Sequence, residues 1–99
     1  MATFDAVFTP AEVDQTGTVG AGVSSTEIVI LPNQIFYLIC NGDANIKFGA
    51  TGLAAATANN FYLPSKTGAR YDSGRTGVAL RIFNPGGSTI NWWIQYLVK

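Results

Sequence analysis

The sequence contains no histidine and a single cysteine, and these two absences exclude much of the usual chemistry of protein sites. Histidine is the commonest general base and the commonest metal ligand in proteins. One cysteine cannot form an internal disulfide, and it cannot build a zinc cluster. Cys40 lies within an apolar run, so we expect a buried and unreactive thiol there. The sequence therefore predicts no catalytic residue, no cofactor and no metal site that depends on either residue type.

Charged residues are also scarce, since they make up 12% of the chain and sum to a net charge of zero. Without a net positive charge, there is no long-range attraction to nucleic acid or to an anionic membrane. No apolar run approaches the ~18 residues that a membrane span needs, and the first residues lack the basic start and apolar core of a signal peptide. We expect a protein made in the cytoplasm, with part of its surface covered by another chain.

The few charges are unevenly distributed along the chain. All but one of the acidic residues precede every basic residue, and Asp72 is the exception. Folding could interleave the two halves and give a mixed surface. Alternatively, the two halves could form complementary patches that meet between copies in a symmetric assembly.

What the sequence does contain is a series of short segments with the two-residue period of β-strands. Turn signals separate these segments every eight to twelve residues, and nothing predicts a helix of any length. The expected strands cover residues 3–8, 15–19, 26–31, 34–40, 44–49, 61–63, 69–72, 78–83 and 90–98. The pattern predicts an all-β fold, a single small antiparallel sandwich of about eight strands. A jelly roll is the preferred topology, with an immunoglobulin-like sandwich as the alternative.

Two of the connections predict β-hairpins. Asn41-Gly42-Asp43 is a strong signal for a tight primed turn that would pair residues 34–40 with 44–49. Asn84-Pro85-Gly86-Gly87 would likewise pair residues 78–83 with the aromatic C-terminal strand. Within this one domain, we assign residues 1–25 to an N-terminal strand and arm and residues 26–99 to the β-sandwich body.

The six carboxylates do not indicate catalysis, because no spacing among them requires a facing pair across a groove. Asp43 is better explained as part of the turn next to it. The neighbouring Ser65 and Lys66 would diverge on a strand, so they do not form a nucleophile pair. The three glycines at positions 17, 20 and 22 lack the lysine and the strand-loop-helix setting of a phosphate loop. We therefore expect a protein that is not an enzyme.

Aromatic side chains are the remaining candidates for function. Trp92 falls among apolar residues and is predicted to lie in the core. Trp93 shares its face with polar residues, so it either packs under a loop or belongs to an interface, where aromatic residues are enriched. Stacking of a sugar on Trp93 or Tyr62 is a third possibility. The interface residues that we predict are Phe4, Phe8, Tyr62, Trp93 and Leu97.

Residues 34–49, with their strand, Asn-Gly turn and Phe48-Gly49 ending, resemble small β-rich virion proteins of tailed bacteriophages. Leu63-Pro64 and the segment from Arg81 to Trp92 extend the resemblance over residues 26–98. The aromatic ending Trp92-Trp93-Ile94-Gln95-Tyr96 and the polar N-terminal third depart from that pattern.

The resemblance implies a capsid decoration, or cement, protein on the surface of the virion. Such a protein has a jelly-roll-like domain, is commonly a homotrimer, binds between subunits of the major capsid protein and has no active site. The alternative is a receptor-binding or carbohydrate-binding domain of a tail fibre or neck component.

Overall fold

The computed structural model describes residues 15–97, and this part of the chain consists of eight β-strands joined by turns and loops. No helix in this range is long and apolar enough to cross a membrane. The strands are β1 (Gln15–Val19), β2 (Ile28–Ile30), β3 (Ile35–Cys40), β4 (Ala44–Gly49), β5 (Phe61–Leu63), β6 (Ala69–Asp72), β7 (Val78–Phe83) and β8 (Ile90–Leu97). The strand expected over residues 3–8 lies outside the described residues.

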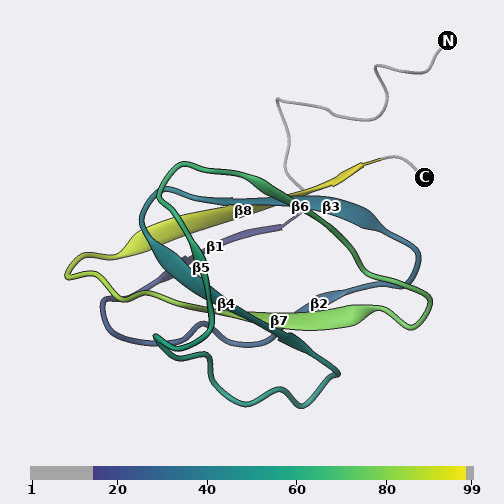
Figure 1. Cartoon of the computed structure of the whole chain (residues 1–99), viewed down its shortest axis with the longest axis horizontal. Helices are drawn as coiled ribbons and strands as arrows, with labels where there is room; N and C mark the ends of the chain where they lie inside the picture. The colour runs from purple at the N-terminus through teal and green to yellow at the C-terminus, as the bar shows by residue number, and fades with distance from the viewer. Residues whose placement is uncertain (1–14, 98–99) are drawn as a thin grey trace, which may run out of the picture.

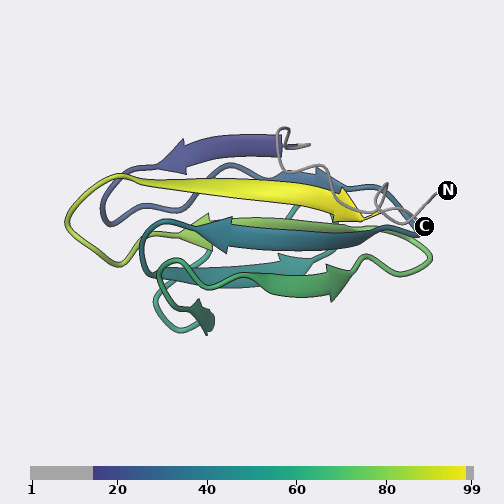
Figure 2. The same cartoon turned by 90° about the horizontal axis from the view of Figure 1, so that it is seen from above.

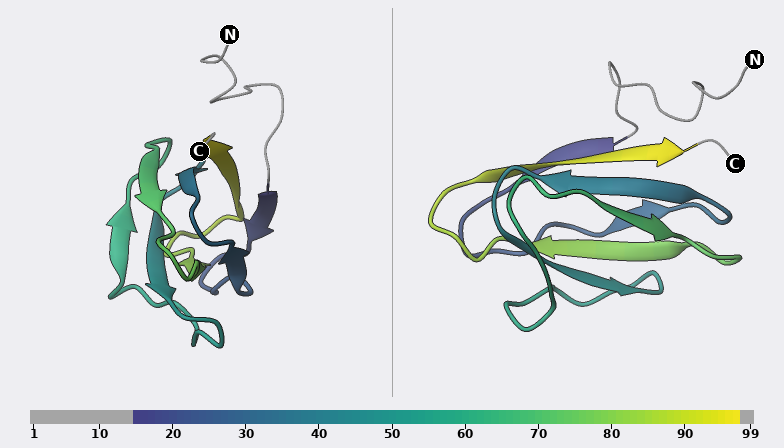
Figure 3. Two further views of the ribbon diagram at one scale, coloured as in Figure 1. Left: turned by 90° about the vertical axis from the view of Figure 1, so that its right-hand side faces the viewer. Right: turned by 45° about the horizontal axis from the view of Figure 1, so that its top comes forward.

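The strands form two four-stranded antiparallel sheets, which we call sheet A and sheet B (Figure 1). Sheet A has the order β1-β8-β3-β6, and sheet B has the order β2-β7-β4-β5. Except at the step from β4 to β5, the chain crosses to the other sheet after every strand. This alternation is the connectivity of a jelly roll, and Figure 2 and Figure 3 show the two sheets stacked. The predicted all-β sandwich of about eight strands is confirmed.

Both predicted hairpins are wrong, although their strands are placed correctly. β3 and β4 lie in different sheets, and so do β7 and β8. β3 instead pairs with β8 and β6, and β4 pairs with β7 and β5. Neither Asn41 nor Gly42 has the positive φ that a primed turn requires. The period of a strand shows which face is buried but not which strand is its partner, and here long-range pairing overrides the local turn preference.

Each misread turn is a crossing between sheets that is held by an asparagine. The Asn41 N–H donates to the backbone oxygen of Asn91 (3.0 Å), and Asn41 Oδ1 accepts from the Asn91 N–H (2.8 Å). Asn84 is completely buried at the end of β7. Its Nδ2 donates to the carbonyls of Val19 (3.0 Å) and Ser88 (2.6 Å), while its Oδ1 accepts from the Gly86 N–H (2.9 Å). These hydrogen bonds give the backbone N–H and C=O groups of the two crossings their partners, so no tight turn is needed there.

The core fills the space between the inner faces of the two sheets. Trp92 is 7% exposed, so its predicted place in the core is confirmed. Gly17 on β1 lies so close that an added Cβ would come within 2.8 Å of the Trp92 ring. The largest fully buried side chains are Phe36, Ile30, Leu38, Ile46, Leu80, Ile82, Ile94, Asn84 and Cys40.

Residues 50–60 form an irregular segment that is fastened to the outer side of sheet B. Glu27 Oε2 accepts hydrogen bonds from the N–H groups of Gly52 (2.6 Å) and Leu53 (2.8 Å). Arg81 donates from Nη1 to the Leu53 carbonyl (3.0 Å), and Asn45 donates from Nδ2 to the Asn60 carbonyl (2.9 Å). The outward-facing Asn45 is buried as a result. Sheet B therefore has part of its outer face covered by its own chain.

Candidate interaction surface

The outer face of sheet A carries an apolar, aromatic surface on its two central strands. On β3, Phe36, Leu38 and Cys40 are buried, so the alternating Ile35, Tyr37 and Ile39 face outward. On β8 the same alternation turns Trp93 and Leu97 outward. We call these five residues, Ile35, Tyr37, Ile39, Trp93 and Leu97, the sheet A surface; Tyr37 is 37% exposed and the other four are half-buried.

The register brings these side chains together in adjacent rows. Ile39 is paired with Trp93, and Thr16 of β1 flanks Trp93 on its other side. Ile35 is paired with Leu97. Residues paired across antiparallel strands lie on one face and in contact range. The predicted interface residues Trp93 and Leu97 therefore lie on the same face, with the polar Gln95, paired with Tyr37, between them on β8.

Three contributors to this surface were missed at the sequence level. Ile35, Tyr37 and Ile39 are not among the predicted interface residues, and the signal that could have identified them is the apolar character of both faces of residues 34–40, which is also typical of a strand buried on both sides. Gly68 is equally important, since an added Cβ there would overlap the Tyr37 ring. The absence of a side chain at position 68 thus lets the Tyr37 ring lie against the backbone.

Tyr62 lies elsewhere, on the edge strand β5 of sheet B. It is 52% exposed, and a hydrogen bond with Asp43 raises the pKa of its hydroxyl. Tyr62 is therefore not part of the surface that contains Trp93 and Leu97. Phe4 and Phe8, the other predicted interface residues, lie outside the described residues.

The carboxylates in the described range each hold a loop. Glu27 binds the 50–60 segment, Asp43 Oδ1 accepts from the Ser65 N–H (2.9 Å), and Asp72 Oδ1 accepts from the Gly74 N–H (2.8 Å). Asp43 was predicted to serve the turn beside Asn41, but its hydrogen bond goes instead to the Ser65 loop, twenty-two residues along the chain. Within residues 15–97, no three acidic or cysteine side chains gather closely enough to hold a metal ion.

Cys40 has the properties expected of an inert thiol. Its side chain is fully buried in the core of the sandwich. Burial raises the pKa of the thiol from 9.0 to about 12, because the thiolate would lose its solvation. The thiol therefore stays protonated near neutral pH.

Comparison with known proteins identifies the fold but no family. No protein-family model matches the chain, and no curated protein sequence matches it. Among solved structures, the chain is similar to the solution NMR structure of a de novo designed double-stranded β-helix, with a TM-score of 0.59 and 18% sequence identity. The match covers 83% of this chain and 95% of the designed one. It supports the two-sheet architecture, and at this level of identity it shows the fold alone.

Proposed function

We propose that this chain is a structural protein of a tailed-phage virion, a decoration protein that binds between subunits of the major capsid protein and stabilises the shell as a homo-oligomer, expected to be a trimer. The observation that carries the proposal is the sheet A surface. Apolar and aromatic side chains, Tyr37 and Trp93 among them, stand outward on the two central strands of a sheet, and aromatic residues are enriched in protein interfaces. The resemblance of residues 26–98 to phage virion proteins is the reason for proposing the major capsid protein as the partner.

The size of the surface suits a contact that is repeated many times. The two central strands lie about 4.8 Å apart and the eight residues of β8 rise about 3.3 Å each, so the sheet A surface covers roughly 250 Å². A stable pairwise interface buries about 800 Å² on each partner. A single contact through this face is thus modest, but contacts repeated on a lattice of linked subunits reinforce one another through effective concentration.

Binding to undecorated capsids tests the proposal. We expect the chain to co-sediment with shells assembled from the major capsid protein of its phage and to raise the temperature at which those shells disassemble. Trp93→Ser should weaken binding at least tenfold, because it removes the largest side chain of the surface. Phe61→Ser, which alters an exposed aromatic residue on β5 of the other sheet, is the matched control and should bind like the wild type. A folded chain that does not bind the shell would refute the proposal.

One feature favours a second candidate, a carbohydrate-binding domain of a tail fibre or neck. Phe61 and Tyr62 are 64% and 52% exposed on β5, and Asp43 lies within hydrogen-bonding range of the Tyr62 hydroxyl. An exposed aromatic ring beside a carboxylate suits a sugar, which stacks on the ring and donates hydroxyl hydrogen bonds. Glycan-array binding that is abolished by Tyr62→Ser and unchanged by Trp93→Ser would support this alternative over capsid decoration.

A further inference from the structure

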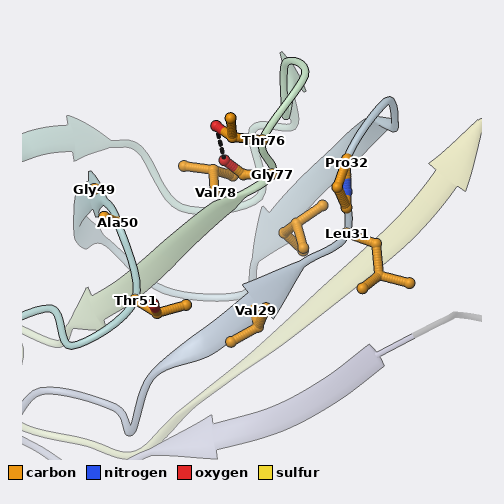
Figure 4. A pocket seen from close by; sticks show the side chains of 10 residues that line it. Val29, Leu31, Pro32, Gly49, Ala50, Thr51, Thr76, Gly77 and Val78 are labelled. Carbon is orange, nitrogen blue, oxygen red and sulfur yellow. Dashed lines mark hydrogen bonds between the residues drawn. The ribbon is translucent and has the colours of Figure 1, made fainter.

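A groove of about 490 Å³ lies at one end of the sandwich beside β2 (Figure 4). It is lined by residues 29–32, 49–51 and 76–78, none of them charged, and the hydroxyl of the lining Thr76 donates to the Gly77 carbonyl (3.4 Å). The groove therefore offers a ligand little specific chemistry. The β3–β4 crossing, by contrast, contains a side-chain amide and a backbone nitrogen that can react with each other.

Asn41 is the one asparagine in the sequence that precedes a glycine. In such a pair the backbone nitrogen of the glycine can attack Cγ of the asparagine, because glycine has no side chain to obstruct the approach. The Gly42 nitrogen loses its proton and bonds to Asn41 Cγ, and ammonia leaves, which gives a cyclic succinimide. Water then opens the ring to aspartate, or to isoaspartate, in which the backbone runs through the side chain and is one methylene longer.

The packing of the crossing requires this reactive pair. A Cβ at position 42 would overlap the Ile90 side chain, so a larger residue, which would slow the reaction, does not fit. Asn41 itself is exposed, so water reaches its side chain. Whether the pair reacts therefore depends on how its two groups are held.

Hydrogen bonds fix the two reacting groups on different elements. The Asn41 N–H donates to the Asn91 carbonyl (3.0 Å), but the Asn91 N–H donates to Asn41 Oδ1 (2.8 Å) and not to the Asn41 carbonyl. The side-chain amide thus takes the place of the residue's own carbonyl and is bound to β8. The Asn41 carbonyl instead accepts from the Ser65 hydroxyl (3.1 Å). Since this carbonyl and the Gly42 nitrogen belong to one planar peptide group, Ser65 fixes the direction of the attacking nitrogen.

We infer that Asn41 is a modification site that is blocked in the folded protein and reacts when the β3–β4 crossing opens. For the two groups to meet, the amide must leave the Asn91 N–H and the peptide group must leave Ser65, which is a local opening of the native structure. The isoaspartate that results lengthens the backbone where Gly42 has no free space beside Ile90, so the native crossing does not re-form. Each completed reaction therefore removes one molecule from the folded population.

Mass spectrometry of the full-length chain, incubated at pH 8 with and without urea, tests this inference. Conversion of Asn41 should be at least about tenfold slower in the folded protein than in urea, because it requires the opening. Ser65→Ala should speed up the conversion in the folded protein severalfold and leave the rate in urea unchanged. Ser88→Ala, at an exposed position of the β7–β8 connection, is the matched control and should react like the wild type. Urea titrations give the unfolded fraction of each variant, and the faster reaction of Ser65→Ala should exceed any increase in that fraction.

Refolding tests the fate of the product. After removal of urea, chains with isoaspartate at position 41 should remain sensitive to protease. Asn41→Asp keeps an oxygen for the Asn91 N–H, so it should refold and resist the protease. Conversion of the folded protein at the rate seen in urea would overturn the inference, and so would a Ser65→Ala variant that reacts no faster than Ser88→Ala. Refolding of the isoaspartate chains to the protease resistance of the wild type would overturn the irreversible step. None of these outcomes depends on capsid binding.

Discussion

Asn84 illustrates how a single buried polar side chain takes the place of a turn. Its amide bonds to Val19, Ser88 and Gly86 and so joins the end of β1 to the β7–β8 connection. The sequence suggested a turn here because Asn, Pro and Gly are frequent in turns. Those residue preferences do not distinguish a turn within one sheet from a crossing between two sheets.

Replacing Asn84 with alanine should be strongly destabilising. Asn84→Ala leaves the buried Val19 carbonyl without its partner, which costs about 1–3 kcal/mol, and it also frees the Ser88 carbonyl and the Gly86 N–H, whose residues are exposed and can bond to water. We expect the free energy of unfolding to fall by about 1–3 kcal/mol in urea titrations. Asn59→Ala, at an exposed position in the 50–60 segment, should change it by less than about 0.5 kcal/mol. Equal effects at the two positions would show that the Asn84 network is not needed.

The buried thiol of Cys40 predicts how the stability of the folded protein depends on pH. The pKa of its thiol is about 12 in the folded protein and 9.0 by its ordinary value, so above pH 9 the unfolded chain loses a proton that the folded chain keeps. The full free energy of unfolding is therefore retained below pH 9. As the pH rises from 9 toward 12, deprotonation of the unfolded chain lowers it by up to about 1.4 kcal/mol per pH unit. Burial also raises the pKa of the Tyr71 hydroxyl, so this group likewise destabilises the folded protein at high pH.

Urea titrations from pH 7 to 11 check this dependence. The wild type should be stable up to about pH 9 and then weaken, and Cys40→Ala should weaken less steeply over the same interval. A thiol reagent at pH 8 should modify the folded wild type no faster than the protein unfolds. Rapid modification of the folded protein would show that Cys40 is accessible.

At the scale of elements, the sequence located the strands well and their partners poorly. β4 and β7 have the predicted bounds because each alternates clearly and ends at a glycine or asparagine. The partner of β3 could not be deduced, since β6 and β8 are both plausible apolar neighbours and lie far along the chain. Glu27, which fastens residues 50–60, could not be recognised either, because its partners are backbone N–H groups about twenty-five residues away.

The residues of the sheet A surface could likewise be identified from the sequence only in part. Trp93 and Leu97 were predictable because β8 alternates and Trp93 interrupts a polar face. Ile35 and Ile39 were not, since an apolar outer face on β3 is equally consistent with a strand buried on both sides. Their exposure depends on which strands flank β3 and on which sheet the 50–60 segment covers.

The contact between β1 and β8 yields a prediction for the strand that begins the described structure. Gly17→Val would place a branched side chain against the Trp92 ring and force β1 away from β8. We expect a loss of about 1–3 kcal/mol in unfolding free energy, typical of overpacking. Thr18→Val adds the same side chain on the exposed side of β1 and should be nearly neutral. A stable Gly17→Val variant with unchanged tryptophan fluorescence would contradict the packing of β1 over Trp92.

At the scale of the whole molecule, the two sheets have different outer faces. Sheet B is partly covered by residues 50–60, whereas the central strands of sheet A present Tyr37 and Trp93. This asymmetry is the basis for proposing that the molecule functions by adhering to a larger assembly through sheet A.

Hydroxyl-radical footprinting with mass spectrometry, on the free protein and on the protein bound to capsids, tests the role of sheet A most directly. Tyr37 and Trp93 should be oxidised in the free protein and protected at least severalfold on the capsid. Phe61 and Tyr62, on the edge of sheet B, should be oxidised equally in both states and serve as internal controls. Protection of Phe61 and Tyr62, with Tyr37 and Trp93 still oxidised on the capsid, would contradict the proposal that sheet A is the binding face.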